Sequence, residues 1–472
     1  MLTKVEADYL IVGAGASGMA FADILLEESD KTCIIVDKYH KPGGHWNDAY
    51  SFVTLHQPSS FYGVSSKELS KGLKDRVGLN KGLNELASGA EIQAYYDDLM
   101  RESFIPSGKV QYFPMCEYLG DGKIRNLLTG EEFTAHYHDK LIDSTYYQTS
   151  IPATHTLAFP VDPSMSVIPP NVLPSLNQAA NMFTVLGGGK TAMDTCVWLL
   201  EKGVNPDAIT WIMPRDGWLL DRKNTQPTQE FFFDSLGAQA AQLEAVASST
   251  DLTDMFLKLE QAGVFIRLDK QVLPSMFHGA TISMLELKTL QKIKNIIRLG
   301  RVTAITPTSI ELDKGSIPTC ADTVHIDCTA SAITNLAITD IFQQDTIRLQ
   351  TVRAYQPVFS AAFIAHIELT YTDEEKKNKL CRVVPLPNHA EDWVELTYRN
   401  MMNQYFWSRE PGLKRWLLNN RLDGFMRIVK GVAFYELNKL KILNRMRKAS
   451  KPAIEKLKQY KKQLAGNPSS AN

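Results

Sequence analysis

Apolar and polar positions near the N-terminus follow first a strand pattern and then a helix pattern. Tyr9–Val12 is a short apolar run, and Met19–Leu26 repeats its apolar positions at helical spacing. The β-rich run Thr32–Val36 comes next and ends at Asp37. Because the glycine-rich sequence VGAGASG joins the first run to the helix, the pattern predicts a strand–helix–strand unit whose turn binds the pyrophosphate of a dinucleotide.

A second segment of the chain repeats this plan. The apolar run Phe183–Leu186 leads into the loop Gly187–Ala192, which is followed by the helical pattern Met193–Lys202 and the strand Ile209–Met213. Two loops of the same kind suggest two bound cofactors. The sequence therefore predicts an α/β fold with two Rossmann-like, doubly wound dinucleotide-binding domains.

The remaining patterns are expected to complete these domains. Between Gln226 and Arg301 the pattern is mainly helical and aromatic, which indicates an insertion over a pocket, with Phe231–Phe233 in the core or lining that pocket. Strand character returns at 302–305, 309–312 and 323–327. We expect the last of these strands, with the small residues Cys328–Ser331 after it, to return the chain to the first domain. From about Asp392 onward the pattern is helical.

Each glycine of the first loop has a separate role in this prediction. Gly13 forms the tight turn, Gly15 lets the backbone approach the pyrophosphate, and Gly18 lets helix and strand pack closely. The helix N-terminus then offers free N–H groups and a partial positive charge to the anion. Asp37 follows Gly18 by nineteen residues, the spacing at which a carboxylate binds the ribose hydroxyls of an adenosine.

The second unit carries cations where the first has this carboxylate. Arg215 stands just beyond the closing strand and suits the extra 2′-phosphate of NADP, whereas an acid would suit NAD. Lys190, inside the loop, is a second candidate phosphate contact. Two alternatives remain open: Arg215 is a surface cation, or the second domain holds no nucleotide because its glycines serve strand–helix packing alone.

Composition and charge narrow the class of protein. A chain of 472 residues with 44% hydrophobic content can bury the cores of two or three domains. Its 51 basic and 52 acidic side chains create no field that favours nucleic acid. There is no apolar run of membrane-spanning length, and the first strand starts too early to leave room for a secretion signal. The six cysteines form no C-x-x-C pair and no metal-like cluster, so we expect reduced thiols, no metal and a cytoplasmic protein.

Two further motifs carry a resemblance to a known family. The sequence GGHW ends at Trp46, is followed by Asn47–Tyr50 and Val53–Gln57, and WIMPRDGW follows the second loop at 211–218. This combination resembles the flavin-containing and Baeyer–Villiger monooxygenases, from Asp8 to about residue 331. The family fingerprint F-x-G-x-x-x-H and a plain Gly-Asp flavin motif are missing, so the chain resembles a divergent branch of the two-dinucleotide-domain flavoproteins.

The resemblance implies FAD on the first loop, NADPH on the second, and contacts for particular residues. Those expected to bind FAD are Gly13, Gly15, Ala16, Ser17, Gly18, Asp37, Lys38, Gly44, His45 and Trp46. Those expected to bind NADPH are Gly187, Gly188, Gly189, Lys190, Thr191, Arg215 and Trp218. Catalytic residues are unknown; the candidates beside the flavin are His45, Trp46, His56 and Gln57. A structural role as turn or core residues is the alternative for these four.

This assignment gives an expected domain organisation. The FAD-binding domain is expected at residues 1–160 and again at 311–390. The NAD(P)-binding domain is expected at 161–310, with its helical insertion at about 226–300. A basic helical region follows at 391–472, with 11 Lys or Arg against two Glu between Lys430 and Leu464. Because cations alternate there with Leu440, Ile442, Leu443 and Met446, a peripheral membrane contact is an alternative to a plain solvated surface.

Three functions are compatible with these features. The resemblance implies an FAD-dependent, NADPH-using monooxygenase that oxygenates a small organic substrate through a C4a-peroxyflavin. The second hypothesis is an NAD(P)H-dependent flavin reductase or dehydrogenase that passes electrons to a quinone or a protein acceptor. The third is a flavin-binding scaffold or sensor without turnover. The expected partners are accordingly a small-molecule substrate and O₂ or another electron acceptor, and no nucleic acid.

Overall fold

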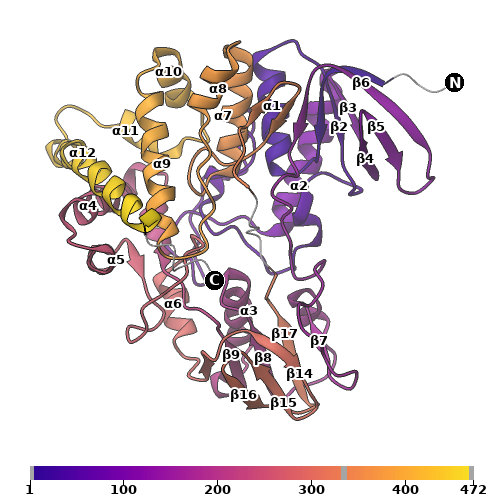
Figure 1. Ribbon diagram of the computed structural model, residues 1–472, viewed down its shortest axis with the longest axis vertical. Coiled ribbons are helices and arrows are strands. Elements are labelled where there is room, and N and C mark those ends of the chain that lie inside the picture. The colour runs from indigo at the N-terminus through magenta and orange to yellow at the C-terminus, as the bar shows by residue number, and fades with distance from the viewer. Residues whose placement is uncertain (1–4, 331–336, 467–472) are drawn as a thin grey trace.

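The first domain is built on a sheet in which five neighbouring strands, β19, β6, β1, β2 and β3, are parallel. The computed structural model describes residues 5–330 and 337–466. The strand order is β18-β19-β6-β1-β2-β3, and β4 and β5 extend β6 as an antiparallel hairpin. The strands are β1 (Val5–Val12), β2 (Cys33–Val36), β3 (Val110–Phe113), β4 (Cys116–Gly120), β5 (Lys123–Asn126), β6 (Glu132–Asp143), β18 (Phe342–Gln343) and β19 (Thr346–Arg348). In Figure 1 the strands β1 to β6 of this domain are indigo to purple.

Helices cover this sheet and form its main core. They are α1 (Ala16–Glu28), α2 (Gly89–Leu99), α7 (Pro357–Thr370) and α8 (Glu374–Leu380). α1 packs against α7, and both bury almost continuous apolar runs in the core cluster that also contains residues of β1 and β2. α2 begins with a capping box in which Ser88 and Glu91 satisfy each other's backbone N–H groups.

The second domain has a fully parallel sheet of its own. Its order is β13-β9-β8-β17-β7, and the helices α3 (Lys190–Glu201) and α6 (Met284–Leu290) pack together beside it. The strands are β7 (Val167–Ile168), β8 (Met182–Leu186), β9 (Ile209–Ile212), β13 (Ile296–Ile297) and β17 (Thr323–Asp327). An antiparallel sheet of β14 (Val302–Ile305), β15 (Ser309–Leu312) and β16 (Gly315–Pro318) is attached to it. The predicted α/β fold with two Rossmann-like domains is confirmed.

One predicted connection is wrong. β17 does not return the chain to the first domain but lies inside the second sheet, where Thr323 pairs with Met182. The small residues after β17 pack against the second glycine loop. Cys328 O lies 2.6 Å from the position that a Cβ on Gly187 would take. The chain enters the first sheet again at β18 and β19, so the boundary expected at residue 311 moves beyond β17. Ser331 lies outside the described residues.

The insertion expected at 226–300 contains helices and short strands. α4 (Phe232–Ser248) and α5 (Leu252–Gln261) pack together, and β11 (Phe265–Ile266) and β12 (Thr281–Ile282) flank β10 (Leu219–Asp221). Phe231 and Phe232 are buried, whereas Phe233 is exposed.

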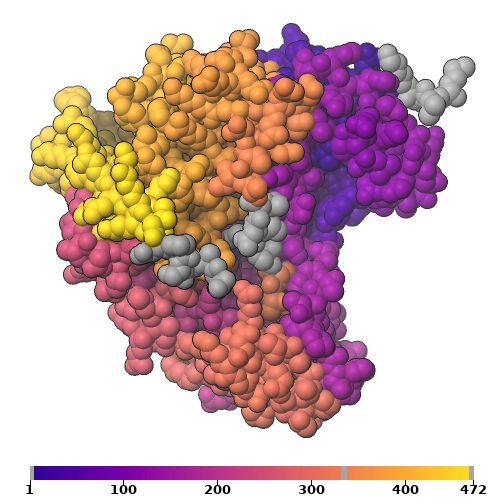
Figure 2. Space-filling view, viewed as in Figure 1, coloured from indigo at the N-terminus to yellow at the C-terminus, as the bar shows by residue number. Residues whose placement is uncertain are grey.

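The C-terminal helices lie against the first domain and the insertion. They are α9 (Asp392–Trp407), α10 (Pro411–Asn419), α11 (Gly424–Lys430) and α12 (Leu437–Gly466). α12 packs against α4 and α9 and is visible in yellow at the surface (Figures 1 and 2). Within the described residues no helix is both long and apolar enough to cross a membrane. The described residues also contain no group of three or more His, Cys, Asp and Glu side chains that could hold a metal ion.

Candidate dinucleotide-binding site

The first glycine loop has the geometry of an anion-binding turn. Gly13 has a positive φ of 101°, and a Cβ there would lie 2.5 Å from Ser144 Oγ. A Cβ on Gly18 would overlap Gly13 O, so helix and strand meet only because this position is glycine. α1 begins after Gly15, which has no side chain to cap the helix, and Ala16 and Ser17 are half-buried. Its first-turn N–H groups are thus available to a ligand.

Asp37, the residue after β2, is hydrogen-bonded to this loop. Its carboxylate accepts hydrogen bonds from Ala14 N at 2.5 Å and Tyr39 N at 2.8 Å. Burial raises the pKa of Asp37, and these two N–H groups oppose that rise. Each carboxylate oxygen accepts one backbone bond and keeps a lone pair, so both can still accept a ribose hydroxyl. The neighbouring Lys38 is exposed.

The GGHW segment folds back onto the same loop. Gly43 N donates to Ala14 O at 2.9 Å, and a Cβ on Gly44 would lie 3.0 Å from Gly15 Cα. The two backbones therefore approach as closely as glycine permits. Trp46 is buried and donates its indole N–H to Tyr62 OH at 2.8 Å. The His45 ring lies beside it, with centroids 5.2 Å apart, and burial lowers the pKa of His45.

The second loop repeats this geometry. Gly187 has a positive φ of 123°, and a Cβ on Gly188 would lie 2.8 Å from Arg215 O. The space around a Cβ on Gly189 is open, and Gly189 precedes α3 just as Gly15 precedes α1. Trp211 donates its indole N–H to Gly187 O at 2.8 Å, which holds the turn against β9.

A cavity of about 610 Å³ opens beside the second loop. Its walls come from the loop, the ends of β9 and β17, the segment 276–280, and His56 from the first domain. His45, Trp46 and Gln57 do not line this cavity. Of the residues predicted for NADPH, the cavity is lined by Gly187, Gly188, Gly189, Lys190, Thr191, Arg215 and Trp218.

One end of the cavity is strongly positive. Arg215 Nη2 donates to Asn388 Oδ1 at 2.7 Å, and His278 Nε2 lies 3.0 Å from the same oxygen. Burial and the nearby Arg301 lower the pKa of Arg215, while Asp392 opposes this. Arg301 also lines the cavity, and its guanidinium has no ion-pair partner among the described residues. Neither Arg301 nor Asn388 was predicted, because no spacing rule connects them to the glycine loop.

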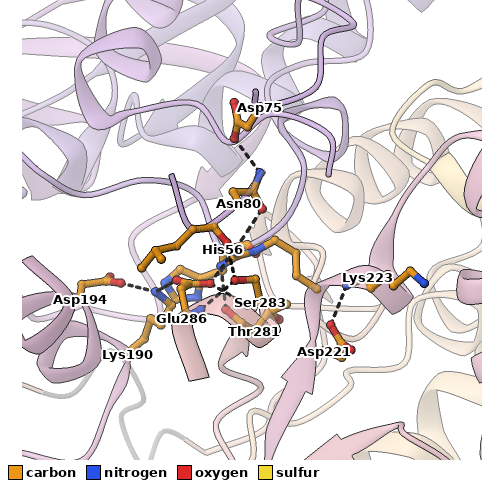
Figure 3. A network of polar contacts seen from close by, with 12 residues as sticks. His56, Asp75, Asn80, Lys190, Asp194, Asp221, Lys223, Thr281, Ser283 and Glu286 are labelled. Carbon is orange, nitrogen blue, oxygen red and sulfur yellow. Dashed lines mark hydrogen bonds and ion pairs between the residues drawn. The ribbon is translucent and has the colours of Figure 1, made fainter. Parts of the chain in front are cut away.

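A buried polar network runs from the second loop to the first domain (Figure 3). Lys190 forms ion pairs with Asp194 and with Glu286, the latter at 3.6 Å. Glu286 in turn pairs with Arg222 at 2.6 Å. Burial would raise the pKa of Glu286, but Lys190 and Arg222 lower it to about 2. Lys190 therefore lines the cavity with its ammonium group already engaged, and its contact with phosphate stays a prediction.

Arg222 connects this network to His56. It donates from Nε to the carbonyl oxygen of His56 at 2.8 Å, and from Nη1 to Asn80 Oδ1 at 3.1 Å. Burial and the positive charges of Lys190 and Arg222 lower the pKa of His56 to about 3. The imidazole at the cavity wall is consequently neutral at neutral pH, and it can donate or accept a hydrogen bond.

Trp218 is mainly a packing residue. Its ring is buried and stacks on Phe256 and Phe265, each with centroids 5.7 Å away. The indole N–H has no hydrogen-bond partner in the described part of the chain. Trp218 still lines the cavity, so its predicted place beside NADPH is compatible with the geometry.

Comparison with known proteins identifies the first unit. Residues 11–56 match the family model described as an NAD(P)-binding Rossmann-like domain, and this range runs from the first glycine loop to His56.

Among solved structures, those similar to this chain include two monooxygenases. The flavin-containing monooxygenase from Stenotrophomonas maltophilia is 13% identical with a TM-score of 0.42, over 80% of this chain and 99% of that chain. Cyclohexanone monooxygenase from Rhodococcus sp. Phi1, bound to NADP⁺, is 12% identical with a TM-score of 0.46, over 77% of this chain and 83% of that chain.

A nearer relative exists among curated sequences. The uncharacterized protein Rv2000 of Mycobacterium tuberculosis is 44% identical over 419 residues, which cover 89% of this chain and 78% of the relative. At this identity and coverage, the chain belongs to the same protein family as Rv2000.

Proposed function

We propose that the protein is an FAD-dependent oxidoreductase that uses NADPH, with FAD on the first loop and NADPH on the second. One observation carries the proposal most directly. The cavity beside the second loop is also lined by His56. His56 is the last residue of the segment 11–56, which matches the Rossmann-like family model and contains the first loop. A nucleotide on one loop and a flavin on the other would therefore meet at His56.

The first loop suits FAD for two reasons. Asp37 presents two carboxylate oxygens for ribose hydroxyls at the end of β2. The GGHW backbone crosses directly over Gly15, as the resemblance to flavin-dependent monooxygenases implies for a flavin. The free first-turn N–H groups of α1 would hold the pyrophosphate.

The second loop suits NADPH because of the charges at the end of its cavity. Arg215 and Arg301 repel each other there, and a bound 2′-phosphate would relieve that repulsion. The neutral His56 imidazole would orient the reacting rings by hydrogen bonding, without a net charge that changes over the neutral pH range. When bound at the first loop, FAD would supply the redox chemistry, with NADPH as the hydride donor and a separate molecule as the electron acceptor.

We favour oxygenation of a small organic substrate as the outcome, on the strength of the sequence resemblance alone. Transfer to a quinone or a protein acceptor is the second candidate, since the chain lacks the monooxygenase fingerprint before the second loop. Both candidates need the same two nucleotides, and they differ in where the electrons go.

The experiment begins with the purified protein and its absorbance spectrum. We expect a flavin spectrum, release of FAD on heat denaturation, and faster flavin reduction by NADPH than by NADH. Oxygen uptake that is coupled to an oxygenated product identifies a monooxygenase, whereas rapid turnover only with an added quinone identifies a reductase. A protein that takes up no FAD, or whose flavin neither NADPH nor NADH reduces, would overturn the proposal.

A further inference from the structure

An exposed aromatic tip stands between α11 and α12. It consists of Phe434, Tyr435 and Leu437, which are 85%, 71% and 66% exposed. The two aromatic rings contact each other edge to face at 5.4 Å. Three large apolar side chains within four positions, all exposed to this degree, are unusual on the surface of a monomer and indicate a contact surface.

Exposed cations follow this tip along α12. Lys441 and Lys448 follow Leu437 on the outer face of α12, and both are exposed and without an ion-pair partner in the described parts of the chain. The opposite face of α12 is closed, because Ile442 and Leu443 pack against the cluster around Phe232. Of the apolar residues expected from the sequence to touch a membrane, Ile442, Leu443 and Met446 are half-buried against this cluster, and Leu440 is also half-buried. The aromatic tip occupies the outer position instead.

A neighbouring turn, residues 71–82, also carries exposed apolar side chains beside exposed cations. Val77 is 80% exposed at its end, beside the exposed cations Arg76 and Lys81. Side-chain contacts join this turn, by way of residues 229 and 230, to α11 and α12. Lys74 forms an ion pair with Glu230, and the adjacent Gln229 donates to Ile428 O in α11 and accepts from Lys439 in α12.

We propose that the aromatic tip and the cationic face of α12 dock on an anionic lipid surface. Exposed Phe, Tyr and Leu side chains enter the boundary between headgroups and acyl chains, while lysines beside them attract anionic headgroups. Interfaces between proteins are enriched in aromatic residues but depleted in lysine, so the unpaired lysines beside the tip favour a lipid surface over a protein partner. The surface lies on elements outside the cavity, so this proposal is independent of the function proposed above.

Vesicle sedimentation with the full-length protein tests the proposal. We expect binding to vesicles of phosphatidylglycerol mixed with phosphatidylcholine, weaker binding to phosphatidylcholine alone, and release at high salt. The double variant Phe434→Ser, Tyr435→Ser should lower the partition coefficient about tenfold or more. Its matched control is Leu128→Ser, which removes an equally exposed apolar residue from the first domain and should bind as the original does.

The contribution of the α12 lysines to vesicle binding is tested by a second pair of variants. Lys441→Glu with Lys448→Glu should abolish the preference for phosphatidylglycerol, whereas Lys288→Glu with Lys292→Glu, at exposed positions on and just after α6, should keep it. Circular dichroism and thermal unfolding verify that each variant is folded. Three results would overturn the proposal: no vesicle binding by the original protein, equal binding by the tip variant, or a tip that instead controls self-association in size-exclusion chromatography.

Discussion

Arg222 Nη1 lies 2.6 Å from Glu286 Oε2, in an ion pair whose guanidinium is only 1% exposed. The same guanidinium also donates to the backbone of His56 in the first domain and of Thr281 in the second. A single buried cation thus holds together the wall at which the two proposed cofactor sites meet. Its positive charge is balanced by Glu286, which also faces Lys190 of the second glycine loop.

Replacing Glu286 should therefore lower the stability of the folded protein. Glu286→Gln leaves Arg222 buried without its carboxylate, and we expect a loss of about 3 kcal/mol in the free energy of unfolding. The matched control is Glu244→Gln, which removes the partner of Arg445 from a surface pair whose side chains are 41% and 44% exposed. That change should cost less than about 1 kcal/mol. Urea unfolding at neutral pH measures both; equal small losses would contradict a structural role for the buried pair.

Asp23 should make the stability depend on pH in the opposite sense to most carboxylates. Burial raises the pKa of Asp23 from 3.8 to about 6, although Ser66 donates to it from both its N–H and its hydroxyl. The folded state therefore holds this proton more tightly than the unfolded state. The contribution of Asp23 to the free energy of unfolding is most favourable below pH 3.8 and is lost as the pH rises through about 6.

Asp23→Asn removes that dependence. The amide can still accept from the Ser66 N–H and donate to its hydroxyl, so the packing is retained. At pH 7 we expect the variant to be more stable by about 1 to 3 kcal/mol, with a flatter stability profile between pH 4 and 6. Unfolding curves across that range decide the matter, and a variant that is less stable at pH 7 would show that the ionised carboxylate stabilises the fold.

The local parts of the fold could be predicted from the sequence, because a strand–glycine loop–helix unit contains its own signals. Gly13, Gly18 and Gly187 occupy positions where a side chain would clash, and their spacing alone indicates this geometry. The pairing of β17 could not be predicted in the same way. A short β-rich run is compatible with either sheet, and only its pairing with β8, far away in the sequence, decides which sheet it joins.

The polar wall of the cavity was missed for a related reason. Lys190 and Glu286 are ninety-six residues apart, on α3 and α6, and meet only because those helices pack together. No pattern of residue types connects Arg301 with Arg215 either. Single residues recruited from separate elements carry no periodic signal, so the sequence predicts the glycine loops better than the side chains that surround them.

The two glycine loops should be separable by mutation. In Gly15→Val the side chain would fill the gap next to Gly44, whose Cα lies 3.7 Å from the Cβ position, and we expect a folded protein without FAD. In Gly189→Val the side chain would enter the open space beside the second loop, so FAD should stay bound while NADPH affinity falls. Flavin absorbance and NADPH titration distinguish the two. Loss of FAD in the second variant alone would reverse the assignment of the loops.

We expect Arg215 and Arg301 to bind the 2′-phosphate of NADPH. A charge-assisted hydrogen bond to phosphate contributes about 1.5 to 3 kcal/mol, so Arg215→Ala should weaken NADPH binding about 10- to 100-fold. NADH, which lacks the phosphate, should bind the variant as it binds the original protein. Arg301→Ala should act in the same direction, while Arg125→Ala, which breaks only a surface pair with Glu117, serves as the control. The measurement is the nucleotide dependence of flavin reduction in a stopped-flow instrument. Equal losses for NADPH and NADH would mean that Arg215 shapes the cavity through Asn388 rather than binding the phosphate.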